Sequence, residues 1–149
     1  MTIIMVVLGA LLWANIAGAA EVVDVALAAN VSEREPVGVF TPAAACQTST
    51  PPADRLPAVD SQAFHGVYLW TKIAAAQTRE IHHRYHKESA GTFTMTTDIA
   101  LSVDASEGWR TWSAKSILRS SMHQGMWRVD VVEAAQAERV LCSVFFTVE

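Results

Sequence analysis

Alternating apolar and polar residues dominate the chain from about residue 21 onward. A repeat of two residues is typical of strands that bury one face. The pattern is clear over residues 23–31, 93–103, 127–131 and 140–148. Further strands are predicted at 66–73, 78–87 and 109–116, and Thr97 interrupts one apolar series in a way that predicts a bulge.

These segments predict an all-β fold, an immunoglobulin-like two-sheet sandwich of about seven antiparallel strands over residues 21–149. A small closed barrel is the alternative that strand counting leaves open. Residues 41–63 contain four prolines, which cannot donate ladder hydrogen bonds. We therefore expect a long Pro-rich loop there.

The first twenty residues differ from the rest, because residues 3–20 carry no charged side chain. An apolar block over 3–13 precedes a tail of small residues, and Ala17 and Ala19 fit the small-residue rule for signal peptidase. Eighteen helical residues span roughly 27 Å, enough for a thin bilayer. The sequence thus predicts one apolar helix over residues 1–20, either a cleaved signal peptide or a transmembrane anchor.

A buried helix of a soluble protein is the third interpretation of this segment. It is the minor one, since the usual features of export are present except a cationic residue before the apolar block. Both leading interpretations place residues 21–149 in the periplasm or another extracytoplasmic space, either free or anchored in the inner membrane.

Composition and charge narrow the classes of function. The formal net charge of −4 argues against a nucleic-acid partner, which normally requires a basic surplus. On one strand, His82 and His86 would lie roughly 13 Å apart, too far to share a metal ion. The sequence shows no nucleophile elbow and no glycine-rich phosphate loop. We therefore expect a protein that is not an enzyme and has no metal or cofactor.

Tryptophan and arginine are the residue types that most often anchor interfaces. Trp127 lies in an apolar series and is predicted to be core, whereas Trp109 and Trp112 have opposite parity, so one should face outward. The candidate contact surface comprises Arg84, His86, Trp109, Arg110, Trp112 and Arg128.

The two cysteines allow two interpretations. In an oxidising compartment Cys46 and Cys142 can form a disulfide that closes a long loop. Cys142 also falls in an apolar series, where a lone thiol behaves as a small buried hydrophobe.

Six short blocks of the chain are distinctive: 34–38, 67–71, Ile81-x-His83-Arg84-Tyr85, Trp109-Arg110-Thr111-Trp112-Ser113-x-Lys115, Gly125-x-Trp127-Arg128-Val129 and Phe146-Thr147-Val148-Glu149. Together they resemble a bacterial family, the domain of unknown function 2914, over residues of about 22–149. The family usually has an aromatic pair where this chain has Tyr85-His86, and the Pro-rich loop is longer here. The resemblance implies the fold and export but no activity.

Three functional hypotheses follow. The first is a non-catalytic exported domain that contacts other proteins, such as an accessory subunit of an integral membrane complex. Residues 3–20 would contact the membrane if they are retained. The alternative is a glycan- or cell-wall-binding module that uses exposed Trp and Arg. The third, a hydrolase, would need two acids, or a His and an acid, brought together by the fold.

Overall fold

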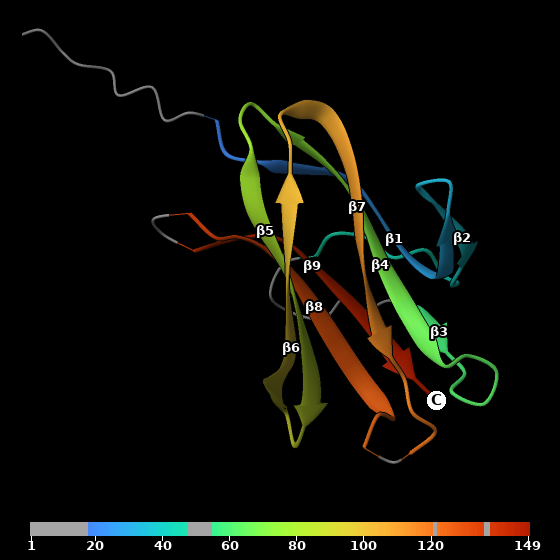
Figure 1. Cartoon of the computed structure of the whole chain (residues 1–149). Helices are drawn as coiled ribbons and strands as arrows, with labels where there is room; N and C mark the ends of the chain where they lie inside the picture. The colour runs from blue at the N-terminus through green and yellow to red at the C-terminus, as the bar shows by residue number, and fades with distance from the viewer. Residues whose placement is uncertain (1–17, 48–54, 121, 136–137) are drawn as a thin grey trace, which may run out of the picture.

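The computed structural model describes residues 18–47, 55–120, 122–135 and 138–149. These residues form strands and no helix (Figure 1). The strands are β1 (Glu21–Ser32), β2 (Glu35–Val39), β3 (Ala58–Val59), β4 (Gly66–Ala75), β5 (Arg79–Ser89), β6 (Thr92–Val103), β7 (Ser106–Ser116), β8 (Gly125–Glu133) and β9 (Arg139–Val148).

The strands form two sheets that pack face to face. The first sheet has four strands in the order β2-β1-β4-β7, and the second has five in the order β3-β9-β8-β5-β6. Among the described residues, all pairs of named strands are antiparallel except β3 with β9, which is parallel. Strands β6 and β7 follow each other in sequence, yet each ends a different sheet (Figure 1).

The core lies between the sheets and follows from the two-residue alternation. Leu69 and Ile73 of β4 face Tyr85 of β5 and Trp127 of β8, and all four side chains are buried. The indole of Trp127 stacks on Phe146 at 6.2 Å between ring centroids. Burial of each large apolar side chain contributes about 1.5–3 kcal/mol, so this layer is the main source of stability.

Bulges in β1, β6 and β9 interrupt the alternation and move side chains to the opposite face. Val23 is the extra residue where β1 shifts register against β4, and its side chain is 52% exposed. In β6 the extra residue is Thr96, next to the predicted break, and it turns Met95 to the outer face beside His86. In β9 a similar shift leaves Val140 exposed. A one-residue insertion has this effect because the side-chain period of a strand is two.

The predicted fold class, an immunoglobulin-like sandwich of about seven antiparallel strands behind an apolar helix, is therefore wrong as stated. The described residues contain nine strands, and β3–β9 is a parallel pair. The helix over 1–20 is not shown: residues 1–17 lie outside the described part, and 18–20 lead directly into β1 without helical structure. What the structure supports is the coarser class, all-β with two sheets.

No helix in the described part of the chain is long and apolar enough to cross a membrane.

Candidate contact surface

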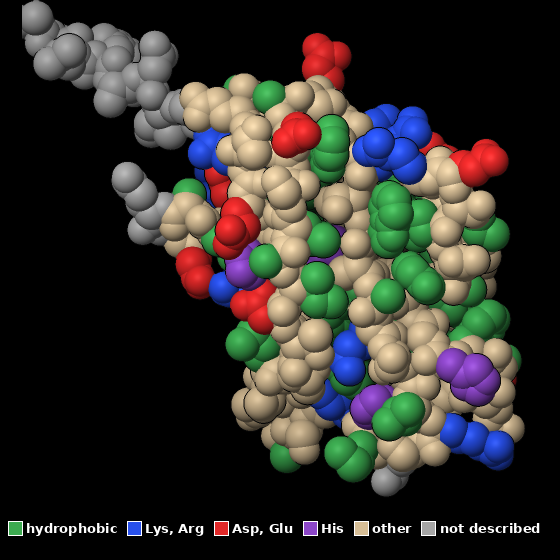
Figure 2. All heavy atoms as spheres, viewed as in Figure 1, with side chains coloured by type: hydrophobic (Ala, Val, Ile, Leu, Met, Phe, Trp, Pro, Cys, Tyr) green, Lys and Arg blue, Asp and Glu red, His purple; other side chains and the backbone are tan. Residues whose placement is uncertain are grey.

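Strands β6 and β7 each end a sheet on the same side of the molecule (Figure 1). A hollow of about 490 Å³ lies there. Strand β6 contributes residues 100–102, strand β7 contributes residues 109–112, and the turn between β1 and β2 contributes Arg34. We call β6, β7 and this hollow the open flank. Figure 2 shows hydrophobic side chains along this side of the molecule.

The tryptophan–arginine group of β7 lies in the open flank. Trp112 pairs with Trp70 across β4 and β7, so both side chains point to the outer face of the four-stranded sheet. Trp70 is buried because the β1–β2 turn covers it, and its indole N–H donates to the carbonyl of Arg34 at 2.9 Å. Trp112 remains half-buried. This leaves Trp112 as a partly exposed aromatic side chain on this face.

The β1–β2 turn is attached to β7 by its charged side chains. Arg34 donates through Nη2 to the carbonyl of Arg110 at 3.3 Å, and its guanidinium lies 5.1 Å from the ring centroid of Trp109. Arg110 in turn forms an ion pair with Glu35, with Nη1 and Oε1 2.8 Å apart. One face of Trp109 is thus already occupied by a cation from the same chain.

The other predicted contact residues lie on the outer face of the five-stranded sheet. Arg84 donates to both carboxylate oxygens of Glu138, at 2.9 and 2.7 Å, and to Asp98 at 3.1 Å. The hydrogen bonds to Glu138 are the main reason that the pKa of Arg84 is raised. Next to it, the ring of His82 contacts Glu80 at 2.7 Å and Asp98 at 2.6 Å, and these two partners raise its pKa.

His86 and Arg128 form a second group on the same outer face, around Asp130. Arg128 Nε lies 3.0 Å from Asp130 Oδ1, and its guanidinium lies 4.9 Å from the ring centroid of Phe93. The hydroxyl of Ser143 donates to Asp130 at 2.7 Å. Burial lowers the pKa of His86, although Asp130, 3.7 Å away, opposes that effect. These cations are engaged within the chain.

The six predicted contact residues therefore do not form one surface. Trp109, Arg110 and Trp112 lie on β7 of one sheet, whereas Arg84, His86 and Arg128 lie on β5 and β8 of the other.

Sequence reasoning missed a buried polar network between the sheets. His83 of β5 is fully buried, and its Nδ1 lies 2.7 Å from the hydroxyl of Ser113 on β7. The hydroxyl of Tyr85 lies 2.8 Å from the same Ser113 oxygen. On the other side of the ring, Nε2 lies 3.5 Å from Thr71 Oγ1, which donates to the carbonyl of Thr111 at 3.3 Å.

One tautomer satisfies every bond of this network. With the proton on Nε2, His83 donates to Thr71 and accepts from Ser113, whose oxygen accepts from Tyr85. Burial lowers the pKa of His83 to about 3 and raises the pKa of Tyr85 to about 12. Both groups are therefore neutral over the ordinary pH range.

An imidazole next to a serine hydroxyl is also the arrangement in which a histidine activates a nucleophile. Here Ser113 and His83 are both buried between the sheets, and the aromatic hydroxyl of Tyr85 already contacts Ser113. A substrate would have no access to the serine oxygen without separating the sheets. The network therefore joins the two sheets, and we assign it a structural role.

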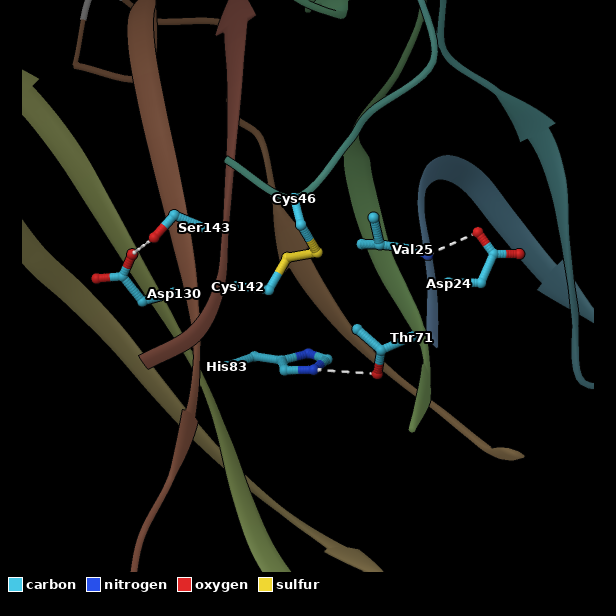
Figure 3. Close-up of a disulfide and its surroundings, with 8 residues drawn as sticks. All are labelled: Asp24, Val25, Cys46, Thr71, His83, Asp130, Cys142 and Ser143. Atoms are coloured by element: carbon cyan, nitrogen blue, oxygen red, sulfur yellow. Dashed lines mark hydrogen bonds between the residues drawn. A yellow bond between two sulfur atoms is a disulfide. The ribbon is translucent and has the colours of Figure 1, made fainter. Parts of the chain in front are cut away.

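The disulfide lies next to this network. Cys46 and Cys142 are joined, 96 positions apart in sequence, and Figure 3 shows the bridge between Val25 of β1 and the His83 ring. The segment before residue 48 is also held by an isolated pairing of Gln47 with Ser143 of β9. The bridge thus attaches the start of the Pro-rich stretch to the five-stranded sheet.

Within the described ranges, no group of three or more His, Cys, Asp or Glu side chains is arranged to hold a metal ion.

Comparison with known proteins gives a family but no activity. The family described as "Protein of unknown function (DUF2914)" matches residues 78–148, which run from the start of β5 to the end of β9. No curated protein matches the sequence. The matched stretch contains β6, β7 and both groups of predicted contact residues.

Proposed function

We propose that this chain, which matches the DUF2914 family model over residues 78–148, is a non-catalytic module that binds other proteins outside the cytoplasm through its open flank. The observation that carries the proposal is the composition of β6. This edge strand has twelve residues, and Asp98 is its one charged residue; it contains no lysine and no proline. Proteins normally protect long edge strands with such residues, because a free edge pairs readily with another chain.

The geometry favours a partner that adds an extended segment beside β6. Backbone hydrogen bonds would provide affinity, and alternate side chains of the partner would enter the hollow between β6 and β7. Leu101 and the half-buried rings of Trp109 and Trp112 would give those side chains an apolar contact. A membrane complex is the finer form of this proposal, because the apolar segment over residues 3–20 would bring the chain to a membrane during export, whether it is then cleaved or retained.

The disulfide supports the extracytoplasmic location. Cytoplasmic thiols are normally kept reduced, whereas bridges such as Cys46–Cys142 persist in oxidising compartments.

The two alternative functions receive less support. Glycan binding needs an open aromatic face, but Arg34 covers one face of Trp109, and Trp70 lies under the β1–β2 turn. Hydrolysis needs an accessible acid pair or nucleophile, and the one hydroxyl–imidazole pair identified above is buried.

Site-specific photo-crosslinking in bacterial cells tests the proposal. A photoreactive amino acid would replace Ala100 or Met95, both exposed on β6, and in a matched control it would replace the exposed Gln62. We expect adducts of higher mass from the two β6 positions and none from Gln62. Equal adducts at all three positions, or only the uncrosslinked chain throughout, would contradict binding through the open flank.

A further inference from the structure

The backbone nitrogen of Ala20 meets a buried carboxylate. It lies 3.2 Å from Glu133 Oε2, across a sequence separation of 113 residues. Ala20 is 1% exposed and belongs to the core cluster, and Glu133 is 4% exposed. The chain just before β1 is therefore fixed against the end of β8.

The two oxygens of Glu133 have different partners. Oε1 lies 3.4 Å from Nη1 of Arg79, whereas Oε2 faces the Ala20 nitrogen. A buried carboxylate is costly unless cations or several donors compensate for its lost hydration. In an uncleaved chain, the Ala20 nitrogen offers a single neutral N–H. In a chain that begins at Ala20, the same nitrogen is an ammonium group with three donors and a positive charge.

The local sequence is compatible with a mature chain that begins at Ala20. Ala17 and Ala19 are small residues at the positions that signal peptidase reads before the Ala19–Ala20 bond. Residues 17–20 are all alanine or glycine, so the sequence alone does not select one bond for cleavage. The structure does, because Gly18 is exposed and Ala19 partly exposed, whereas Ala20 fills the core. Cleavage one residue later would remove a core side chain and leave Glu133 without this donor.

We propose that signal peptidase hydrolyses the Ala19–Ala20 bond during export and that the new α-ammonium group of Ala20 forms an ion pair with Glu133. Water adds its hydroxyl to the carbonyl carbon of Ala19 as the C–N bond breaks, and the leaving nitrogen takes up protons to become the ammonium. The chain then folds with this end inserted beside β8. Charge-assisted hydrogen bonds of this kind are roughly twice as strong as neutral ones.

Cleavage also removes a contact, since Arg79 donates through Nη2 to the carbonyl of Gly18 at 3.4 Å. Arg79 retains its ion pair with Glu133. The ammonium and Arg79 would then approach the carboxylate from two sides. The inference rests on the export part of the proposed function and not on the partner at the open flank.

The first experiment is the mass of the mature amino terminus. The full-length chain would be expressed in a bacterial host, fractionated, and the purified product analysed by intact mass and terminal peptide sequencing. We expect a product that begins at Ala20. Ala17→Leu should leave the uncleaved precursor, whereas the matched control Ala14→Leu should be processed normally. An amino terminus at any other residue would overturn the inference.

The second experiment tests the ion pair through amine reactivity. An amine-acylating reagent would be applied to the processed protein under native conditions and in urea, and the label on Ala20 quantified against exposed lysines. We expect native labelling of Ala20 to be slower by roughly tenfold or more, the factor that corresponds to one pKa unit. Glu133→Gln should restore fast labelling. A terminal amine that reacts equally fast in the native and unfolded protein would refute the ion pair, without any need for the variant to fold.

These results separate the inference from the proposed function. An extracytoplasmic product with a different amino terminus refutes the inference alone. A cytoplasmic product that retains Met1 refutes both the inference and the proposed export. The crosslinking experiment on β6 is independent of both outcomes.

Discussion

The buried ring of His83 should make the protein acid-sensitive in a defined pH window. The ring is fully buried, and burial lowers its pKa from 6.5 to about 3. In the unfolded chain the ring takes up a proton below pH 6.5, whereas in the folded chain it stays neutral. Stability contributed by the neutral ring is therefore complete above pH 6.5 and is lost as the pH falls toward 3.

The magnitude follows from linkage. At pH 4.5, two units below the ordinary pKa, the folded state should have lost about 3 kcal/mol relative to a chain without this group. At pH 3 the loss reaches about 4 kcal/mol, which is a large part of the whole stability of many small domains. The effect should therefore be measurable well before general acid unfolding is complete.

Urea unfolding followed by tryptophan fluorescence, at several pH values between 7.5 and 4.5, measures this loss. Carboxylates also titrate in this range, so the quantity to compare is the difference between the wild-type protein and His83→Asn, which retains an acceptor for Ser113. The stability advantage of the wild-type protein should shrink as the pH falls. A difference that stays constant with pH would refute the argument, as would an imidazole NMR signal from His83 that titrates near pH 6.5.

The neighbouring residue, His82, supplies a control whose effect on stability should depend on pH in the opposite direction. His82 lies on the outer face, and hydrogen bonds to Glu80 and Asp98 raise its pKa. Its contribution is present below pH 6.5 and is lost as the pH rises through its raised pKa. In His82→Gln the stability difference from the wild-type protein should therefore grow as the pH falls, while the difference for His83→Asn shrinks.

Three further predictions concern stability. Replacement of both Cys46 and Cys142 by alanine should lower the free energy of unfolding by about 2–5 kcal/mol, because the bridge spans 96 positions. Urea unfolding of the oxidised wild-type protein with and without reductant measures the same loss. An unchanged unfolding midpoint would contradict this prediction. Leu69→Ala should cost about 2–5 kcal/mol in urea unfolding, since the side chain is fully buried between the sheets, and a cost below 1 kcal/mol would show that the core is not packed as described. Glu138→Gln, which removes an exposed partner of Arg84, should leave the thermal midpoint unchanged at physiological salt, and a large drop would contradict the small contribution of surface ion pairs.

The long strands could be predicted from the sequence because each buries one face. The segments expected from alternation correspond to β1, β4, β5, β6, β7, β8 and β9. The two missed strands lack that signal. Strand β2 contains Pro36 and Gly38, and Gly38 adopts a positive φ of 67°, so its composition is typical of a turn rather than a strand. Strand β3 has two residues, and they form a strand only because β9 lies beside them.

The predicted faces failed where a bulge shifts the chain by one residue. Alternation placed Val23 and Val140 on buried faces, yet both are exposed, because register shifts in β1 and β9 invert the pattern beyond them. The candidate contact residues are divided between the two sheets for a related reason. Spacing along the sequence does not reveal which sheet a strand joins, so Arg110 and Arg128 were assigned to one surface although they lie in different sheets.

The buried network shows what a single sequence cannot provide. Side chains alternate between the two faces of a strand, so the sequence alone places His83 opposite to His82 and Arg84, and its inward orientation is predictable. Its partners were not, because Ser113 and Thr71 come from two strands of the opposite sheet, and serine and threonine are common on exposed faces of strands.

The parallel pairing of β3 with β9 determines the order in which this protein can fold. Residues 58 and 59 are placed by hydrogen bonds to residues made much later, since Thr147 donates to the carbonyl of Pro57 and Glu149 donates to that of Val59. Val59 is nonetheless fully buried. Contacts between such distant residues raise the contact order, and loop-closure entropy must be overcome before they form. We therefore expect refolding on a timescale of milliseconds to seconds, with completion of the five-stranded sheet as a late step.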